Sequence, residues 1–503
     1  MILQDTFIVL KKLSVKNIHI EPRKVKAEYC VENFSGETDS YELIYSYDNA
    51  YFNRKNPEDI NLASMMLAQV ALNYGLFFET IEFDGLYDKT DQKFLSNMME
   101  NTSREIITNK LLIKNEFIKS PFDKLKPEKR TRYTNSRVSF VNTRFRGMTF
   151  NKPEETTDPE KYAILSSGGK DSLLTYGIIN EIGQAYPVFI NEAGRHWFTA
   201  VNTYKHFKQI EPNIEKPWCN SDRVFNWMLK RLPFIRENYA GIRADIYPIR
   251  LWTVAVFLFG VLPVVRKKGI GNVLIGNEYD TTVKGETAGI THYNGLYDQS
   301  KFFDNALTRY YRSKGWQIKQ FSILRSLSEL LIMKILTKRY PDLQMHQVSC
   351  HAAHKQGDRM VPCGKCEKCR RIIGMLKAMD EDPCRCGYTE NQIIGGLAAL
   401  ERQSVKQIGS DASHLYYLLL SKNLIAKNDH TKRLARQHDE ITKLRFDKER
   451  STLSDMPVHI RKTLFEIFGK YADGAVQRKG HLWENIEIDN NFLTSHPYKL
   501  DKK

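Results

Sequence analysis

The sequence predicts an α/β protein built around a doubly wound parallel sheet, with further units on either side of it. Two observations lead to this fold class. Between residues 161 and 340, short apolar runs alternate with helix-like segments, which is typical of βαβ units. Four cysteines then cluster between residues 350 and 369, at spacings that suit a structural zinc ion. We therefore expect a parallel-sheet core that ends in a zinc knuckle.

The order of elements within this core follows from the apolar runs. Each strand is a short run rich in Ile, Val, Leu and Tyr, and each helix has apolar residues at helical spacing. We expect strands at 162–167, 186–190 and 272–276, and helices at 171–182, after 196, at 251–267 and at 325–339. Alternation of this kind favours parallel strands joined by crossover helices.

Length and composition indicate a globular protein of several domains. The chain has 503 residues, of which 42% are hydrophobic and 27% charged. Its longest apolar run, Leu251 to Val265, is short for a membrane span and contains Gly260 and Pro263, so we expect a buried helix and no membrane contact. The N-terminus lacks a basic segment followed by an apolar one, and eight cysteines fit a reducing compartment. These features predict a cytoplasmic location.

The chain divides into four segments. Residues 1–120 show strand-like alternation before an apolar helix, and predict an α+β domain. Residues 121–160 carry prolines and many charges, and are typical of a linker. Residues 161–380 form the core with the cysteine cluster, and residues 381–503 predict a mostly helical domain.

Positive charge is concentrated before the core. The formal net charge is +16, and residues 101–150 hold twelve Lys and Arg against four Asp and Glu. The densest part runs from Lys124 to Tyr133. A solvated charged face and a patch for nucleic acid or an acidic partner both explain it. No helix-turn-helix or RNA-recognition signature accompanies the charge, so nucleic acid stays an open, minor alternative.

The segment SSGGKDS at 166–172 follows a predicted strand and opens a predicted helix. Gly168 and Gly169 allow backbone N–H groups to approach an anion, and Ser167 and Ser172 add hydroxyl donors. The order of residues differs from the nucleotide-hydrolysing P-loop, which ends in Gly-Lys-Ser/Thr. A tight strand–helix turn without a ligand is the simpler alternative.

The motif SGGKDS resembles the PP-loop, the SGGxDS motif of the ATP pyrophosphatases. The resemblance implies that Ser167, Gly168, Gly169, Asp171 and Ser172 bind the β- and γ-phosphates of ATP as a pyrophosphate leaving group. Enzymes of this family cleave ATP between the α- and β-phosphates and transfer AMP to a substrate oxygen. Argininosuccinate and NAD synthetases, tRNA lysidine synthetase, thiouridylases and 7-cyano-7-deazaguanine synthase share the motif, so the loop alone does not choose among them.

The four clustered cysteines predict a closed metal site. They are Cys350, Cys363, Cys366 and Cys369, and their thiolates suit tetrahedral zinc. Four sulfur ligands leave no open coordination position, so the predicted role is structural rather than catalytic.

Two further cysteines, Cys384 and Cys386, lie outside this spacing. A second site, a redox pair and ordinary surface thiols all remain open for them.

The knuckle is similar to the C-terminal zinc site of the QueC family, the 7-cyano-7-deazaguanine synthases. Ser349-Cys350 and CGKCEKCR carry this likeness, although the segment between them is longer here. That segment holds His351, His354 and Lys355, for which a role in the site and a solvated loop are both open.

Four shorter matches to this family follow in family order. They are Arg195-His196, Pro248 with Arg250, Gly276 with Asp280, and Ser328-Glu329. One departure affects the base-binding side: LYDQS at 296–300 replaces the family's Tyr-Pro-Asp-Cys-Arg.

The resemblance implies roles for the matched residues. Lys170, Arg195 and Arg250 would neutralise phosphate charge together with Mg²⁺. Asp171 and Asp280 would ligate the Mg²⁺. His196 would take a proton from the attacking amine, unless it is a cap or core histidine.

The expected nucleotide contacts are Ser167, Gly168, Gly169, Asp171, Ser172, Gly276 and Asp280. The expected cofactors are ATP, Mg²⁺ and a structural Zn²⁺.

The resemblance also implies a reaction. The carboxylate of 7-carboxy-7-deazaguanine would be adenylated, and an amine would displace AMP. Longer antiviral QueC-like proteins, of the QatC and type IV CBASS kinds, have a similar core with extra regions. Their resemblance suggests that the activated deazaguanine is coupled to the N-terminal amine of a partner protein of a defence operon.

Three alternatives stay open: a nitrile-forming synthase that uses ammonia, a non-catalytic nucleotide-binding module, and other PP-loop chemistry. A homodimer is what the family implies.

Overall fold

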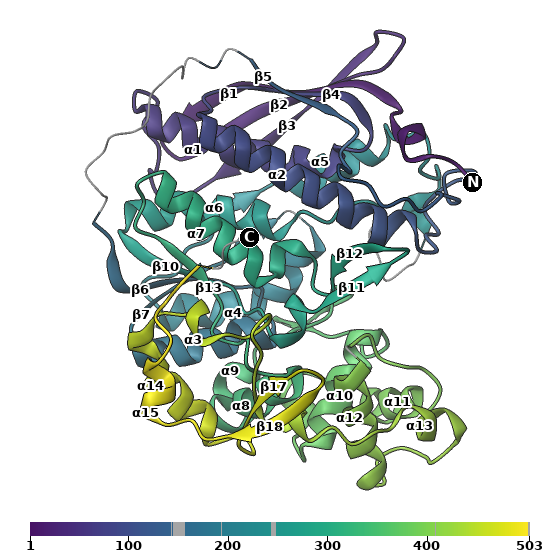
Figure 1. Ribbon diagram of the computed structural model, residues 1–503, viewed down its shortest axis with the longest axis vertical. Helices are drawn as coiled ribbons and strands as arrows, with labels where there is room; N and C mark the ends of the chain where they lie inside the picture. The colour runs from purple at the N-terminus through teal and green to yellow at the C-terminus, as the bar shows by residue number, and fades with distance from the viewer. Residues whose placement is uncertain (142, 144–155, 193, 243–247, 408, 501–503) are drawn as a thin grey trace.

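The computed structural model describes residues 1–141, 143, 156–192, 194–242, 248–407 and 409–500, and of Arg195 only the backbone. The molecule is stacked in three parts (Figure 1). A large sheet covered by α1 and α2 lies at the top, the parallel sheet lies in the middle, and the C-terminal elements lie below. The α/β class predicted from the sequence is confirmed.

Seven strands form the upper sheet, in the order β5-β4-β1-β2-β3-β9-β8. β1, β2 and β3 are antiparallel, whereas β4 pairs parallel to both β1 and β5. The elements of this part are β1 (Leu10–Glu21), β2 (Lys24–Glu32), β3 (Thr38–Ser46), α1 (Pro57–Ala68), β4 (Phe78–Asp84), α2 (Lys89–Ile106), η3 (Ile107–Leu111), β5 (Arg137–Val141), β8 (Asn191–Glu192), β9 (Trp218–Cys219) and α5 (Ser221–Leu229).

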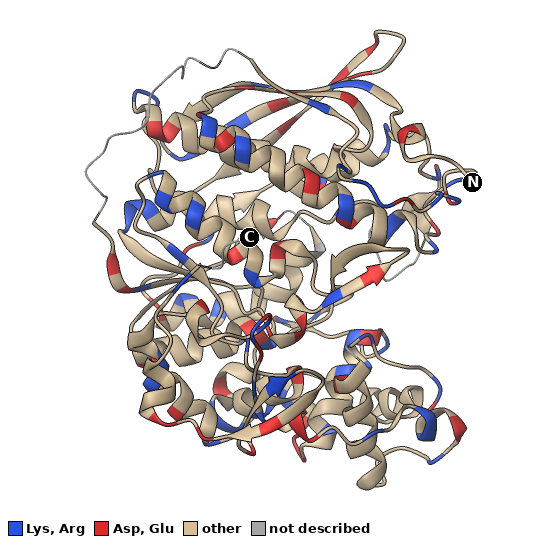
Figure 2. Cartoon of the chain, viewed as in Figure 1, with Lys and Arg blue, Asp and Glu red and all other residues tan. Residues whose placement is uncertain are grey.

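The N-terminal sheet includes strands from segments predicted to lie outside it. β5 comes from the segment predicted as a linker, while β8 and β9 come from the predicted core. Strand alternation over so few residues is too short to detect in the sequence. The basic segment also packs on this unit, because Arg130 pairs with Asp5 and Glu128. Elsewhere on the cartoon in Figure 2, positions of Lys and Arg, in blue, are interspersed with those of Asp and Glu, in red.

Four parallel strands form the central sheet, in the order β13-β10-β6-β7. Helices cover both faces: Ala163 of β6 packs in the cluster that contains α6, and its neighbours Tyr162 and Ile164 pack in the cluster that contains α3 and α8. The elements are β6 (Asp158–Leu165), α3 (Lys170–Ile182), β7 (Gln184–Val188), α4 (Arg195–Ile210), α6 (Val254–Lys267), β10 (Ile270–Leu274), the hairpin β11 (Lys284–Thr287) and β12 (Ile290–Tyr293), α7 (Lys301–Ser313), β13 (Lys319–Phe321), α8 (Glu329–Arg339) and α9 (Pro341–Gln344).

The strand order fixes where a ligand can bind. The chain moves outward from β6 to β7 and then returns to the other side of β6 for β10. Open α/β sheets bind ligands at such a reversal, in the crevice outside the carboxyl ends of the strands. The segment SSGGKDS follows β6 and the segment IGNEYD follows β10, so both predicted motifs meet there.

The apolar run from Leu251 to Val265 forms most of α6, as predicted. Val256 and Leu262 are fully buried, and the hydroxyl of Tyr47, directly after β3, donates to the carbonyl oxygen of Gly260 at 2.7 Å. One hydrophobic cluster therefore joins the upper sheet to the core. No helix in the described part of the chain is both long and apolar enough to cross a membrane.

The C-terminal part has two portions. A helical portion packs around the cysteine cluster, and a second portion adds a three-stranded sheet, β16-β17-β18, to the face of the core that carries α3. The prediction of a mostly helical domain missed this sheet, whose strands are only three to five residues long. The elements are β14 (His354–Gln356), β15 (Arg359–Val361), α10 (Glu367–Ala378), α11 (Glu390–Leu400), α12 (Gly409–Ser421), α13 (Asp429–Leu434), β16 (Leu444–Phe446), α14 (Val458–Gly469), β17 (Ala475–Lys479), β18 (Leu482–Ile486) and α15 (Asn490–Thr494).

The segment LYDQS at 296–300 has a structural role. The carboxylate of Asp298 is buried and accepts a hydrogen bond from the backbone N–H of Val254, at the start of α6, at 3.1 Å. Burial raises the pKa of Asp298 to about 7, although the backbone hydrogen bonds oppose this rise. Asp298 therefore caps α6 from within the core.

This burial predicts a pH-dependent stability difference. Between about pH 4 and pH 7, Asp298 is protonated in the folded protein and ionised in the unfolded chain, because folding raises its pKa. The contribution of this proton to stability is therefore complete below about pH 4 and is lost as the pH rises through 7. Asparagine does not titrate, so the unfolding free energy of Asp298→Asn should not show this loss. The difference in unfolding free energy, variant minus wild type, should rise by about 1.4 kcal/mol for each pH unit between about 4 and 7. Denaturant titrations from pH 5 to 8 measure this, with exposed Asp48→Asn as the control. A difference that does not change with pH would contradict the assignment.

Candidate active site and zinc centre

The loop after β6 is held in a conformation that requires glycine. Gly168 has a φ of +74°, and a Cβ there would overlap the carbonyl oxygen of Thr199 in α4. The hydroxyl of Thr199 in turn donates to the carbonyl oxygen of Ser167 at 2.9 Å. Gly169 is the N-cap of α3 and provides no side-chain cap, so no capping side chain engages the N–H groups of the first turn. These are the conditions under which a helix start accepts an anion.

A cavity of about 610 Å³ opens at this point. Five of the residues predicted from the sequence line it: Ser167, Gly169, Lys170, Asp171 and Asp280. Others come from segments far apart in the chain, including Glu278, Asn294, Glu329, Ser349, His351, Lys368, Arg371, Lys406 and Gln407. The core, the β11–β12 hairpin region and the C-terminal helical portion therefore enclose one space.

Two predicted residues lie beside the cavity rather than in its wall. Gly276 brings the end of β10 against α3, and a Cβ there would lie 2.7 Å from the Cβ of Asp171. Ser172 is buried, and its hydroxyl donates to the carbonyl oxygen of Gly169 at 3.1 Å. Both residues shape the loop in this structure.

Lys170 is the cation at the centre of the acidic wall. Its ammonium lies 2.6 Å from the carboxylate of Asp171 and 3.3 Å from those of Glu278 and Glu329. The side chain of Lys170 is buried, whereas that of Asp171 is 32% exposed. The lysine thus neutralises several carboxylates at once, and Asp171 keeps one side open to the cavity.

The carboxylates around Lys170 do not titrate alike. Burial raises the pKa of Glu278 well above its ordinary value, against the opposing charge of Lys170, and the charges of Asp280 and Asp171 add to the rise. Burial and the charges of Asp411 and Glu329 raise the pKa of Asp280 to about 7. At Glu329 the burial effect is overcome by Lys170 and Arg371, which lower the pKa to about 2.

The three carboxylates around Lys170 outnumber its single positive charge, and a divalent cation would relieve this local excess. Asp280 fits such a role, because its Oδ1 is buried without a hydrogen-bond partner among the described residues.

The sequence did not assign the buried carboxylate of Glu192, which joins two predicted residues. Glu192 accepts hydrogen bonds from Arg250 at 2.9 Å and Ser221 at 2.9 Å, and its Oε2 lies 3.0 Å from His196 Nδ1. Burial alone would raise the pKa of Glu192, but the charge of Arg250 and these hydrogen bonds lower it to about 2. The side chain of Arg195, predicted beside them, lies outside the described residues. One sequence signal could have identified Glu192: it follows a short apolar run and lies just before Arg195-His196.

His196 connects this carboxylate to the cavity. Its ring lies 4.6 Å from that of His351, centroid to centroid, and His351 lines the cavity. The ammonium of Lys368 lies 3.4 Å from His351 Nε2. His354 and Lys355, by contrast, lie in the β14–β15 hairpin with exposed side chains.

The ion pair of Glu192 predicts a large stability effect. Glu192→Gln would leave the buried guanidinium of Arg250 without the charge it faces, and we expect a loss of about 3 kcal/mol or more of unfolding free energy. Glu32→Gln is the matched control, since Glu32 faces Lys11 at 2.6 Å on the surface and should cost less than about 1 kcal/mol. Denaturant unfolding of both variants gives the comparison, and equal losses would refute a special role for the buried pair.

The four predicted cysteines come together. Their sulfur atoms all lie within 4.8 Å of one another, and the Cys366 sulfur lies 3.5 Å from that of Cys350 and 3.6 Å from that of Cys369. Tetrahedral zinc with Zn–S bonds of about 2.3 Å separates its sulfur ligands by about 3.8 Å, so the arrangement suits zinc. Gly364, with a φ of +72°, makes the tight turn of the knuckle.

Cys384 and Cys386 take no part in this cluster. Cys384 is exposed and Cys386 is buried, and the metal-ligand cluster found among the described residues does not include them.

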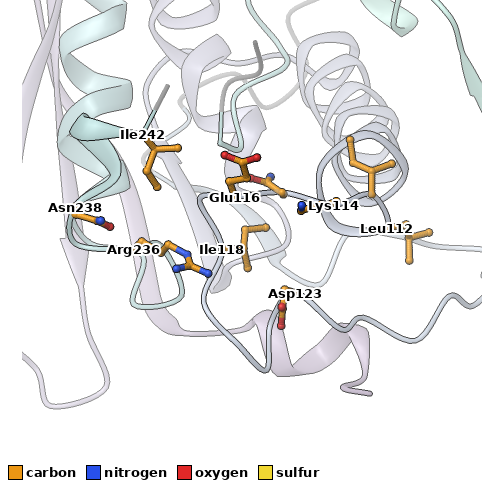
Figure 3. A pocket seen from close by; sticks show the side chains of 10 residues that line it. Leu112, Lys114, Glu116, Ile118, Asp123, Arg236, Asn238 and Ile242 are labelled. Carbon is orange, nitrogen blue, oxygen red and sulfur yellow. The ribbon is translucent and has the colours of Figure 1, made fainter. Parts of the chain in front are cut away.

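A second cavity, of about 550 Å³, lies beside the segment that follows η3 (Figure 3). Its charged side chains are of both signs: Lys114, Glu116, Asp123 and Arg236. None of the residues predicted as functional lines it, and its balanced charge favours neither an anion nor a metal.

Family models, curated proteins and solved structures were all compared with this chain, and none of them matches it. The case for a function therefore rests on the residues and the geometry of the chain itself.

Proposed function

We propose that this protein is a QueC-like ATP-dependent ligase, which adenylates the carboxylate of 7-carboxy-7-deazaguanine and couples the activated acyl group to an amine. The observation that carries the proposal is the position of SSGGKDS. The loop lies at the reversal of strand order in a parallel sheet, and its residues line a cavity together with Asp280 from the segment after the neighbouring strand β10. The order of residues in the loop, which fits a pyrophosphate leaving group, supports attack at the α-phosphorus.

The reaction has two steps. A carboxylate oxygen of the acid attacks the α-phosphorus of ATP, the bond from that phosphorus to the bridging oxygen of the β-phosphate breaks, and pyrophosphate leaves. The amine then attacks the acyl carbon, the bond from this carbon to the AMP oxygen breaks, and AMP leaves with one oxygen of the original carboxylate. The amine gives up one proton to a base. His196, oriented by Glu192, is our candidate for that base.

The charges around the cavity suit the first step. Carboxylate and triphosphate are both anions, so their approach needs positive charge. Lys170 and the N-terminus of α3 supply it at the loop, and Mg²⁺, when bound, would neutralise phosphate charge. Asp171 and Asp280 would hold this ion, because the first faces the cavity and the second has an unpaired buried oxygen.

The zinc site would hold the fold rather than take part in the chemistry, because its four sulfur ligands leave no coordination position open. Cys350 and Cys369 are both fully buried, which fits this structural role.

The acceptor amine is proposed to be the N-terminus of a partner protein in anti-phage defence. The lining of the cavity supports a large acceptor. Lys406 and Gln407, which lie outside the predicted core, line the same cavity and extend the surface that a protein acceptor could contact. With ammonia as acceptor, the product would be a free amide or, after a second adenylation, a nitrile.

Oxygen-18 transfer tests the proposal. The protein is incubated with ATP, Mg²⁺ and 7-carboxy-7-deazaguanine whose carboxylate carries ¹⁸O, with and without ammonium. We expect pyrophosphate and AMP that contains one ¹⁸O, since the oxygen can reach AMP only through the acyl adenylate. Unlabelled AMP, ADP, or no nucleotide product would reject the reaction, and tight ATP binding without turnover would indicate a nucleotide-binding module instead.

A further inference from the structure

Tyr279 separates two acidic residues that line the cavity, Glu278 and Asp280. Its side chain is 2% exposed and packs against the C-terminal sheet. The guanidinium carbon of Arg445, in β16, lies 4.0 Å from the centroid of the tyrosine ring. A guanidinium over an aromatic face is attracted to it, and more strongly when both groups are shielded from water, as they are here. The C-terminal sheet therefore contacts directly the segment that carries both carboxylates.

The hydroxyl of Tyr279 is fixed by two residues that follow β16. It donates to Asp447 Oδ2 at 3.2 Å and accepts a hydrogen bond from Arg450 at 3.2 Å. The tyrosine side chain is thus held at its ring and at its hydroxyl. Because its two neighbours in sequence are the acidic residues of the cavity, the backbone that positions their carboxylates is held with it.

Arg445 also attaches the start of α8 to the C-terminal sheet. Its backbone N–H donates to the carbonyl oxygen of Ser326 at 2.9 Å. The hydroxyl of Ser328 donates to the carbonyl oxygen of Ile441, shortly before β16, at 2.6 Å. Ser328 is the N-cap of α8, and Glu329 is the first residue of this helix. The position of the Glu329 carboxylate therefore depends on the same strand.

The charge of Arg445 is compensated within the C-terminal part. Its guanidinium, in a side chain that is 2% exposed, lies 3.3 and 3.5 Å from the two carboxylate oxygens of Asp411, in the first turn of α12. The charges of Asp411 and Arg445 act on the pKa of Asp280 in opposite directions. The ion pair as a whole is neutral, so it can lie behind the acidic residues without repelling a cation from them.

We infer that Arg445 is a positioning residue, which fixes the spacing of the carboxylates of Glu278, Asp280 and Glu329 and thereby sets the affinity of the cavity for a divalent cation. Arg445 does not line the cavity, so it acts through Tyr279 and the start of α8. This inference rests on the proposed function, in which Asp280 helps to hold Mg²⁺, and it gives the C-terminal sheet a task in that function. Residues that orient metal ligands from outside typically change metal affinity 10- to 100-fold when they are replaced.

Metal binding without turnover tests the inference. Mn²⁺, as a probe for Mg²⁺, is titrated into the full chain with and without α,β-methylene-ATP, which cannot be cleaved between its α- and β-phosphates. Free Mn²⁺ is followed by electron paramagnetic resonance. Arg445→Lys keeps a positive charge beside Asp411 but lacks the planar group over Tyr279, and should raise the Kd for Mn²⁺ about tenfold or more. The double variant Arg445→Met with Asp411→Asn leaves no buried charge unpaired and should show the same loss.

Arg461→Met is the matched control for these variants. Arg461 is a second fully buried arginine of the C-terminal part. Its guanidinium donates to the backbone carbonyl oxygens of Met456, Leu493 and His496, and these residues do not line the cavity. The variant should lose stability but bind Mn²⁺ with wild-type affinity below its melting temperature. A rise in Kd equal to that of Arg445→Lys would show that general destabilisation, not positioning, weakens the metal site.

The Mg²⁺ dependence of AMP formation separates a positioning role from a purely structural one. In Arg445→Lys, the half-saturating Mg²⁺ concentration should rise about tenfold, whereas the rate at saturating Mg²⁺ should stay near that of wild type. A structural defect would reduce the active fraction, and so would lower the rate at every Mg²⁺ concentration with an unchanged half-saturation point. That result, or a wild-type Kd for Mn²⁺ in both Arg445 variants, would overturn the assignment.

The two proposals fail in different ways. Weakened Mn²⁺ binding in the Arg445 variants, with no ¹⁸O transfer by wild type, would reject the ligase reaction and leave the positioning role supported. Transfer of ¹⁸O by wild type, with unchanged Mn²⁺ affinity in the Arg445 variants, would reject the positioning role alone. A wild type that binds no Mn²⁺ in either condition would reject the metal site and this inference together.

Discussion

Cys369→Ser should lose the metal and unfold the helical portion that surrounds it. Cys350 and Cys369 are fully buried, and the apolar cluster around them contains Ile373, Leu376 and Tyr416. Structural zinc supplies binding free energy on the order of 10 kcal/mol or more to small folded units. A cluster of four thiols without metal, two of them fully buried, has no comparable source of stability, so the loss should be large.

The effect should reach the cavity through α10. Cys366 is the N-cap of this helix, and Glu367, Arg370 and Arg371 hold the segment 404–406 by hydrogen bonds. Release of the helix start would move Lys406 and Gln407 away from the cavity. We therefore expect catalytic activity to fall together with the metal.

Elemental analysis and limited proteolysis measure these effects. Wild type should contain one zinc per chain, whereas Cys369→Ser should contain none and should be cleaved between residues 380 and 440. Cys384→Ser is the control, because Cys384 is exposed and lies outside the cluster. Loss of zinc in that control, or a metal-free wild type that resists the protease, would show that the cluster is not a structural zinc site.

The core was predictable because its signals are local. The strands around 162 and 272, the helices at 171–182 and 251–267, and the cysteine cluster each follow from a short pattern, and each is found where expected. The loop residues were predictable for the same reason, since Gly168 adopts a positive φ and packs directly against the backbone of α4.

The flanking units were harder because their contacts are long-range. β5, β8 and β9 are too short to show alternation and are strands only because the sheet beside them offers hydrogen bonds. The same holds for β16, β17 and β18, which the helical pattern of the segment concealed. The domain boundaries proposed from the sequence stay a prediction.

The less predictable part of the site consists of buried charges whose partners lie far away in sequence. Lys170 pairs with Glu278 and Glu329, which follow it by more than a hundred residues. Glu278 had a local signal, since it lies two residues before Asp280 after a predicted strand, but no local pattern connects it with Lys170.

Asp171→Asn should nearly abolish AMP formation while it leaves the fold intact. The Asp171 carboxylate is the acidic group of the loop with an open side to the cavity, and it lies in the first turn of α3, where phosphates are proposed to bind. Loss of one group that stabilises transition-state charge, here through the Mg²⁺ that Asp171 is proposed to hold, typically costs a factor of about 100 to 1,000 in rate. Lys170 would still pair with Glu278 and Glu329, so its buried charge would stay compensated and the melting temperature should change little.

The matched control for Asp171 is Asp429→Asn. Asp429 is also an aspartate in the first turn of a helix, α13, but it is exposed and does not line the cavity, so the substitution removes the same charge at a helix start away from the site. Initial rates of AMP and pyrophosphate formation, measured over a Mg²⁺ titration, should be normal in Asp429→Asn. In Asp171→Asn the residual rate should require more Mg²⁺, because one proposed ligand is gone. A rate in Asp171→Asn equal to that of the control would place the chemistry elsewhere on the protein, since no reaction at this loop could be indifferent to a charge at the start of its helix.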